Sequence, residues 1–174
     1  MKQLHFVVSL PNRNSYHLEQ ADSARETARH LGAEVEILTA DDDALLQSQQ
    51  VSKVVQAAAD KRPDAILFEP LSSTGLVKVG EAAVTAGIGW VVLNSDVDYL
   101  GRLRASSKVP VFGVTRDHSE IGRMQAQQFA ALLPQGGTVL YLQGPPTSAA
   151  AAQRASALEI SKLSNIKIKA MKSQ

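Results

Sequence analysis

The chain has 174 residues, of which 44% are hydrophobic and 20% are charged, and its formal net charge is +1. This length and composition fit one globular domain or two very small ones, and they exclude a chain that is disordered throughout. A near-neutral charge gives no support to nucleic-acid or membrane-surface binding, and the absence of cysteine excludes disulfides and thiolate metal sites.

Short apolar runs alternate with longer helical patterns along the chain. We predict strands at Leu4–Leu10, Glu34–Thr39, Ala65–Phe68, Ile88–Leu93, Val109–Thr115, Thr138–Leu142 and Ile166–Ala170. Most of these runs hold few charges, which is typical of strands buried on both faces of a parallel sheet. Helices are predicted to begin near Ser15, Asp42 or Asp43, Ser73 or Thr74, Asp117, and Thr147 or Ser148, and to end near Leu31, Lys61, Gly87, Leu133 and Leu163. The alternation predicts an α/β fold with a doubly wound parallel sheet, Rossmann-like in its winding.

One polar stretch, from Asn94 to Val109, interrupts this alternation and is interpreted as a loop without a helix. The strand that follows is interpreted as a passage from one sheet to another, so we place a lobe boundary near Val114–Asp117. The predicted domains are residues 1–114 and residues 115–174. The second holds only about two strands and two helices after its entry strand, too little to bury a sheet on both faces. The sequence is therefore expected to be cut short, or to be completed by another chain.

Polar segments follow the predicted strands, where open α/β sheets bind ligands. These segments are Ser9–Tyr16, Glu69–Thr74, Asn94–Asp98, Thr115–His118 and Gln143–Ser148. The first offers hydroxyl, amide, guanidinium and aromatic groups, which suit a polyhydroxylated ligand. The alternative for each segment is an ordinary turn, surface loop or helix cap.

Other chemistry finds little support in the sequence. The run Asp41–Asp43 is interpreted as a negatively charged helix start rather than a metal site. The four histidines have no metal-ligand spacing, although His17 and His118 lie near the predicted ligand-binding edge. Neither a dinucleotide fingerprint nor a phosphate-binding loop nor a nucleophile elbow is present. We expect no catalytic residue, no metal and no cofactor.

The segments and their order resemble the periplasmic sugar-binding proteins of ABC transporters, above all the ribose-binding proteins, whose fold the effector domains of the lactose-repressor family share. The resemblance is carried by Phe6–Ser9 with the loop to Tyr16, Ala65–Pro70, Trp90–Asn94, Val114–His118 with Ile121 and Gly122, Gly137–Gly144, Thr147–Ala150 and Arg154. It covers nearly the whole chain. It implies two similar lobes that close over a sugar, here a complete first lobe and a partial second lobe.

Carried over by position, the resemblance implies ligand-binding roles for Ser9, Asn12, Arg13, Ser15, Tyr16, Glu69, Asn94, Ser95 and Asp117. Asn94 and Ser95 replace an Asp-Arg pair that is usual in the family, and Ser15 stands where an aromatic ring is common. These departures argue against ribose itself as the ligand.

The resemblance implies the solute-binding component of an ABC-type sugar transporter, which is not an enzyme. The implied partners are a monosaccharide or related small polar ligand and a membrane permease. No nucleic acid is expected. A second copy of the chain is a further expected partner if the truncation is genuine. A periplasmic location is implied, with a cytoplasmic location as the alternative because the first strand begins with no signal peptide before it.

Three other functions stay open. The first is the effector-sensing domain of a lactose-repressor-type regulator or of a sensor protein, although no helix-turn-helix precedes Leu4. The second is a phosphoacceptor receiver domain, whose acidic positions are held here by Asn12, Arg13 and Glu69. The third is a small α/β enzyme, for which no arrangement of residues specifies a reaction.

Overall fold

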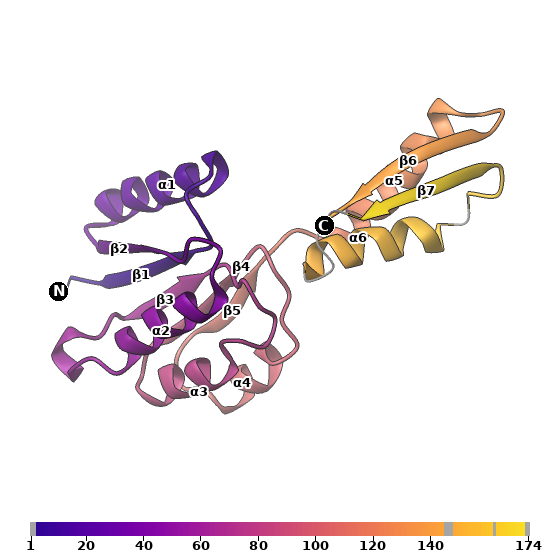
Figure 1. Cartoon of the computed structure of the whole chain (residues 1–174). Helices are drawn as coiled ribbons and strands as arrows, with labels where there is room; N and C mark the ends of the chain where they lie inside the picture. The colour runs from indigo at the N-terminus through magenta and orange to yellow at the C-terminus, as the bar shows by residue number, and fades with distance from the viewer. Residues whose placement is uncertain (1–2, 145–147, 162, 173–174) are drawn as a thin grey trace. The chain divides into compact units, whose positions relative to one another are not determined.

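The computed structural model describes residues 3–144, 148–161 and 163–172 (Figure 1). Its elements, in chain order, are β1 (His5–Leu10), α1 (Ser15–Leu31), β2 (Glu34–Thr39), α2 (Ala44–Val55), the 3-10 turn η1 (Ala59–Lys61), β3 (Ala65–Phe68), α3 (Val77–Thr85), β4 (Gly89–Leu93), α4 (Leu100–Ser106), β5 (Val111–Val114), α5 (His118–Leu132), β6 (Gly137–Gln143), α6 (Ala149–Ile160) and β7 (Ile166–Lys172). They divide into two compact units, residues 1–115 and 116–174. That these units are two lobes closing over a ligand stays a prediction.

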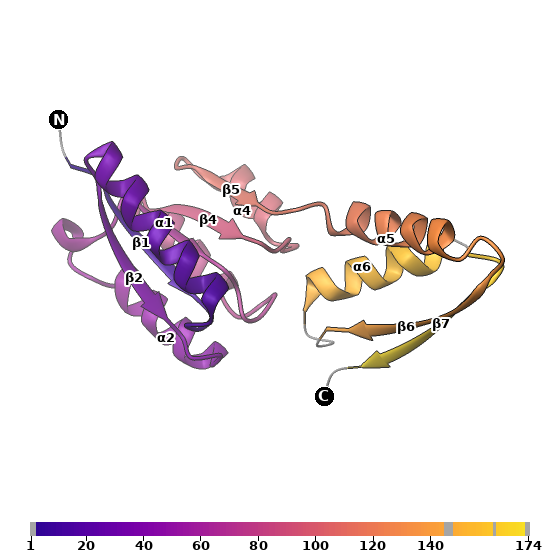
Figure 2. The same ribbon diagram turned by 90° about the horizontal axis from the view of Figure 1, so that it is seen from above.

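The first unit is a five-stranded parallel sheet in the order β2-β1-β3-β4-β5. Helix α1 covers one face, and α2, α3 and α4 pack against the other (Figures 1 and 2). Successive strand residues point to opposite faces, so Val7 lies in the core under α2 and α3 while Val8 packs under α1. Two covered faces explain why the strands are apolar almost throughout, and they confirm the predicted α/β fold.

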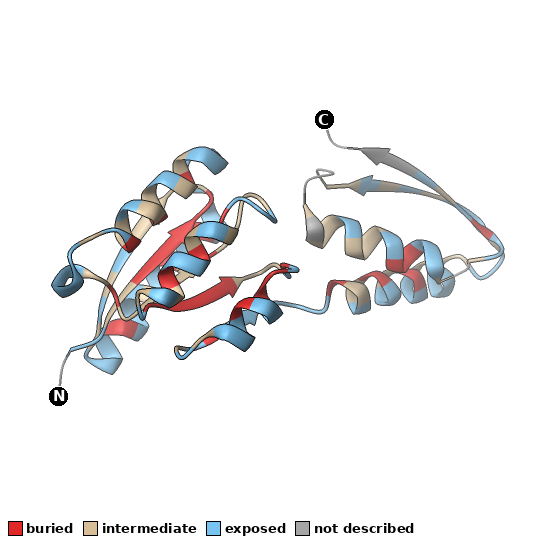
Figure 3. Cartoon of the chain, turned by 90° about the horizontal axis from the view of Figure 1, so that it is seen from below, coloured by how far each residue is buried: buried red, intermediate tan, exposed pale blue. Residues whose placement is uncertain are grey.

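The larger core lies between the sheet and α2, α3 and α4, where the strands are coloured as buried in Figure 3. Trp90 on β4 is fully buried, and its ring centroid lies 4.5 Å from that of Phe68 on β3. Helix α3 approaches this pair at Gly80. A Cβ added to Gly80 would lie only 3.0 Å from the Trp90 indole ring, so a larger residue would not fit without a shift. Removal of these large rings from water is a main stabilising contribution to the unit.

Several helix ends follow the predicted capping chemistry. Gly32 ends α1 in the left-handed conformation (φ 65°), and the Asp43 carboxylate accepts hydrogen bonds from the first backbone N–H groups of α2. Asp117 caps α5 by accepting a 2.7 Å bond from the Glu120 N–H. Ser148 caps α6, while its alternative Thr147 lies outside the described residues.

The structure also corrects several expectations. The stretch from Asn94 to Val109 contains helix α4, whose residues Leu100 and Leu103 are buried against the main core. Because this helix makes only two turns and carries a glycine and two arginines, its apolar spacing is too short to recognise in the sequence. Strand β5 is not a passage to a second sheet, since it pairs in parallel with β4 of the first.

Some helix bounds differ as well. Asn14 rather than Ser15 caps α1, α2 ends at Val55 before a separate 3-10 turn, and α6 ends at Ile160. Helix α3 begins at Val77 without a side-chain cap, instead of at Ser73 or Thr74. At α1 a capping side chain one residue earlier sets the bound, whereas α3 begins without any side-chain cap.

The second unit pairs β6 with β7 in parallel and packs α5 against α6. The two helices meet at Gly122, where a Cβ would contact the Arg154 carbonyl oxygen and lie 2.8 Å from the Ala157 Cβ. Leu140 and Leu142 on β6 are exposed, as expected for a two-stranded sheet with one face uncovered. Within the described residues, no helix has the length and apolar character needed to cross a membrane.

Candidate functional site

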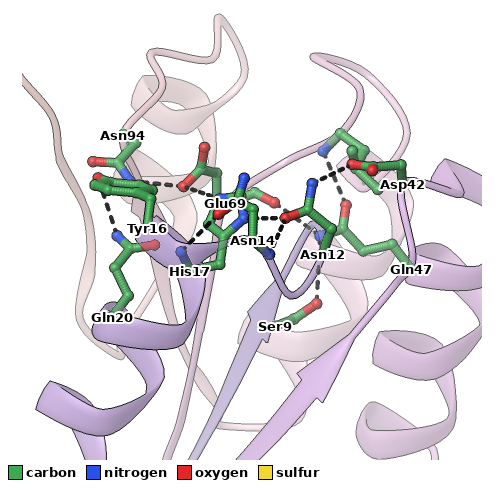
Figure 4. Close-up of polar contacts among 11 residues, drawn as sticks. Ser9, Asn12, Asn14, Tyr16, His17, Gln20, Asp42, Gln47, Glu69 and Asn94 are labelled. Atoms are coloured by element: carbon green, nitrogen blue, oxygen red, sulfur yellow. Dashed lines mark hydrogen bonds and ion pairs between the residues drawn. The ribbon is translucent and has the colours of Figure 1, made fainter.

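The strand order has a switch point at the carboxyl ends of β1 and β3. From β1 the chain crosses by α1 to β2 on one side, whereas from β3 it crosses by α3 to β4 on the other side. The loops after these two neighbouring strands therefore diverge, and such switch points are where open α/β sheets bind ligands. Four polar side chains gather at this edge and are linked in a chain (Figure 4): Asn12, His17, Glu69 and Asn94.

Asn12 organises the loop after β1. Its Oδ1 accepts a 3.0 Å bond from the Asn14 N–H and lies 2.6 Å from His17 Nδ1, while its Nδ2 donates to Asp42 Oδ1 at 2.7 Å. Asn14 in turn caps α1 by accepting from the His17 N–H. The start of α1 and the β2–α2 loop are thus fastened to one side chain, which fixes the loop after β1.

Glu69 lies at the end of β3, with its side chain 20% exposed. Its Oε2 accepts a 2.7 Å bond from Asn94 Nδ2 and lies 3.5 Å from His17 Nε2. Asn94 follows β4 with a positive φ of 56°, a conformation that asparagine tolerates better than most residues. Since both contacts fall on Oε2, the second carboxylate oxygen has no hydrogen-bond or ion-pair partner among the described residues and can accept.

Tyr16 supplies an aromatic ring beside this polar cluster. It lies in the first turn of α1, is 37% exposed, and meets the His17 ring edge-on at a centroid distance of 5.4 Å. Gln20, one turn later, donates to the Tyr16 hydroxyl at 3.4 Å. An accessible ring next to fixed polar groups can cover the apolar face of a sugar while the polar groups bind its hydroxyls.

Gln47 on α2 supports the cluster from below, and sequence reasoning missed it. It is 1% exposed; its Nε2 donates to the Glu69 carbonyl at 2.8 Å and to Ser9 Oγ at 3.4 Å, and its Oε1 accepts from the Leu71 N–H at 3.0 Å. A signal for it existed, because Gln47 occupies the same buried helical stripe as Val51 and Val55. A polar residue at a core position of a helix needs partners, and here they are the backbone on both sides of Pro70.

The other predicted site residues have different surroundings. Ser9 is fully buried beneath the cluster, where its hydroxyl meets Gln47. Ser15 and Arg13 are exposed, and Arg13 Nε donates to Thr39 Oγ1 at the end of β2. Ser95 is half-buried next to Asn94. Asp117 belongs to the second unit, where it caps α5, and its ligand role stays a prediction.

A concavity lies on the face of the sheet that α1 covers. It has a volume of about 570 Å³ and is lined mainly by apolar side chains, among them Phe6, Val8 and Val35, and it reaches the polar cluster at Tyr16 and Gln20, which line it as well. Such a lining buries apolar surface but offers few groups for hydroxyls. The described residues contain no group of three or more side chains arranged to hold a metal ion. The polar cluster is therefore the better candidate for recognition of a hydrophilic ligand.

Comparison with known proteins agrees with this fold. The sequence profile of the family described as "Periplasmic binding protein domain" matches residues 6–171. The fold is similar to the fructose-binding periplasmic domain of a hybrid two-component system (21% identity, TM-score 0.80) and to an ABC-transporter solute-binding protein from Actinobacillus succinogenes with bound D-allose (23%, 0.82). It is also similar to the myo-inositol-binding protein of Caulobacter (19%, 0.79).

These three structures cover 98% of the chain, while the chain spans only 54%, 59% and 55% of theirs, respectively. The chain therefore shares the fold of these structures along about half of their length. A search of curated proteins gave no match.

Proposed function

The chain belongs to the periplasmic binding protein family, and from this premise we propose that it binds a monosaccharide or a related polyol at the polar cluster of the first unit. The observation that carries the proposal is the fixed array of Asn12, Glu69 and Asn94 beside the accessible Tyr16 ring. Carboxylate and amide groups held by other contacts bind hydroxyls without a further loss of side-chain entropy.

The solved structures of similar fold support this ligand class. These proteins bind D-allose, myo-inositol and fructose, and all three ligands are small and rich in hydroxyl groups. The departures from the ribose pattern at Asn94 and Ser95 favour one of these other polyols over ribose. Asn12, Arg13, Ser15, Tyr16, Glu69, Asn94, Ser95 and Asp117 are proposed to contact it, with the buried Ser9 acting through Gln47.

We infer that the protein works as the solute-binding component of an ABC-type transporter in the periplasm. Binding closes the two lobes, and a membrane permease recognises the closed form. A second copy of the chain is a further proposed partner, because apolar side chains such as Phe112 and Val114 on β5 are exposed.

A second candidate is the sensing domain of a regulator. It is favoured by the similarity to the fructose-binding domain of a two-component system. Both candidates share the sugar site and differ in what the chain is joined to. A reading frame that continues into a kinase or a DNA-binding domain would favour the sensor over the transporter.

Titration calorimetry tests the site directly. The protein is titrated with D-allose, myo-inositol, D-fructose and D-ribose, and at least one of the first three is expected to bind more tightly than ribose. Tyr16→Ala is expected to weaken that binding about fivefold or more, because a stacked aromatic ring contributes about 1 kcal/mol or more.

The matched control is Leu18→Ala, an exposed side chain on the same helix that lies outside the cluster. It is expected to bind as the unmodified protein does. Equal affinities for Tyr16→Ala and the unmodified protein would contradict the assignment of the site.

A further inference from the structure

His17 is the one ionisable side chain of the polar cluster that is nearly inaccessible, at 6% exposure. It occupies the first turn of α1, and its ring lies between Asn12 and Glu69, as Figure 4 shows. Each ring nitrogen therefore faces one polar partner. The identity of those partners determines how many protons the ring carries.

The orientation of the Asn12 amide is fixed by its other neighbours. The Asp42 carboxylate can only accept, so the group 2.7 Å from it is the Asn12 NH₂. The Asn14 backbone N–H can only donate, so the group 3.0 Å from it is Asn12 Oδ1. That same oxygen lies 2.6 Å from His17 Nδ1, and because it is an acceptor, Nδ1 must carry a proton.

The other ring nitrogen faces a carboxylate. His17 Nε2 lies 3.5 Å from Glu69 Oε2. In a neutral ring with its proton on Nδ1, Nε2 would turn a lone pair toward that negative oxygen, which is repulsive. A second proton, on Nε2, turns the repulsion into an attraction between opposite charges in a partly buried site.

We propose that His17 is a positioning residue that carries both ring protons and holds Glu69 Oε2, so that Glu69 Oε1 accepts hydroxyls of the bound ligand. This inference rests on the proposed sugar-binding function and adds the chemistry by which Glu69 is aimed. Asn94 Nδ2 donates to the same Oε2 at 2.7 Å, so the two donors fix one edge of the carboxylate. The free edge suits two neighbouring hydroxyls of a polyol.

Charged groups nearby determine whether His17 and Glu69 are both charged. The N-terminus of α1 favours the Glu69 carboxylate and opposes a cation, so the His17 charge depends on Glu69. Asp42 adds a second negative charge behind Asn12, whereas Arg13 is directed to Thr39. The remaining titratable neighbour is the Tyr16 phenol, which meets the His17 ring by its edge. Loss of the Nε2 proton removes the attraction that holds Glu69, so ligand affinity is expected to fall as the pH rises.

The first test measures the ring itself. Nitrogen-15 NMR of the imidazole side chains, recorded without ligand and from about pH 5.5 to 8.5, is expected to show His17 with both nitrogens protonated at the lower pH. A His17 ring with one proton throughout that range would overturn the inference.

The second test measures affinity over the same pH range, with D-allose and myo-inositol as probes. Affinity in the unmodified protein is expected to be lower at the high end of this range, where Asn94 alone holds Glu69 Oε2. His17→Gln is expected to bind more weakly and without this pH dependence, while Trp90 fluorescence checks that it is folded. His30→Gln, at an exposed position at the end of α1, is expected to keep the pH dependence.

The outcomes separate this inference from the proposed function. Binding that is independent of pH in the unmodified protein, or equally dependent on pH in His17→Gln, contradicts the role of His17 alone. No binding of any sugar at any pH contradicts the proposed function, and the NMR measurement still decides whether His17 carries two protons.

Discussion

Gln47 connects the hydrophobic core to the ligand-binding edge with one buried side chain. Its amide meets the backbone on both sides of Pro70 and the Ser9 hydroxyl on β1. The loop after β3 thereby keeps a fixed distance from β1, and Glu69 is held where Asn94 and His17 reach it. The geometry of the polar cluster thus depends on a residue with 1% exposure.

Replacing Gln47 is expected to destabilise the first unit. Gln47→Ala leaves the Glu69 carbonyl and the Leu71 N–H without their partner in a dry environment, and the free energy of unfolding is expected to fall by about 2 kcal/mol. Urea unfolding followed by fluorescence measures this, because the single tryptophan, Trp90, lies in the core of this unit. Gln49→Ala, exposed on the same helix, is the control, and equal stabilities of the two variants would refute the role of Gln47.

Tyr99 makes the first unit sensitive to alkali. Burial raises the pKa of Tyr99 above its ordinary value of 10.0, and the Trp90 indole N–H opposes part of this rise, although the two groups do not form a hydrogen bond of ordinary geometry. The unfolded chain therefore loses this proton before the folded chain does. The free energy of unfolding is expected to fall as the pH rises above about 10.

The same urea experiment, repeated between about pH 9 and 11, checks this expectation. Tyr99→Phe should lose part of the alkaline decrease, and Tyr141→Phe in the second unit should retain it. A Tyr99→Phe variant with an unchanged pH dependence would show that the phenol does not titrate differently on unfolding.

The sequence indicates candidate site residues whose position follows from the nearest strand, but it does not show contacts between segments far apart in the chain. Asn12, Glu69 and Asn94 lie in loops that follow strands, so the rule that ligands bind at the carboxyl ends of strands indicates their segments. The family resemblance singles out these residues and Tyr16 within the segments, and their ligand contacts stay a prediction. The contacts of His17 and Gln47 join segments up to 52 residues apart in the chain, through Glu69. Such contacts are set by strand order, which no local pattern contains.

At the scale of single elements, the apolar strands were predictable and short helices were not. The bounds of β2 and β3 agree with the sequence prediction because turn residues border a clear apolar run on both sides. Helix α4 was missed because seven residues are too few to establish a helical period. With α4 present, β4 and β5 are joined like the preceding strands, so β5 extends the first sheet.

Helices α5 and α6 pack closely at Gly122, where an added side chain has no room. Gly122→Ala would place a Cβ against the Arg154 carbonyl and 2.8 Å from the Ala157 Cβ, so the helices must separate at a cost of about 1–3 kcal/mol. Hydrogen exchange measured by mass spectrometry is expected to be faster in peptides from α5 and α6 and unchanged in the first unit.

The control for this variant is Gly101→Ala on α4, where an added Cβ meets no atom within 4 Å. Its exchange is expected to match that of the unmodified protein. Unaltered exchange in α5 and α6 of Gly122→Ala would mean that the helices do not depend on this close approach.

At the scale of the whole molecule, the first unit carries the chemistry that the family membership leads one to expect. Its sheet has helices on both faces and a polar cluster at its switch point. The apolar concavity along α1 and the exposed leucines of β6 are surfaces of a different kind. They suit association with other protein surfaces better than hydroxyl recognition.

Binding of a polyol at the polar cluster after β1, β3 and β4 can be detected residue by residue with backbone amide NMR. Spectra are compared before and after addition of whichever of D-allose, myo-inositol and D-fructose binds best. We predict shifts concentrated in residues 12–17, 69–71 and 94–95, with little change at Val35 and Thr27 in the apolar concavity. Shifts confined to that concavity, or no shifts with any of the three, would contradict the account.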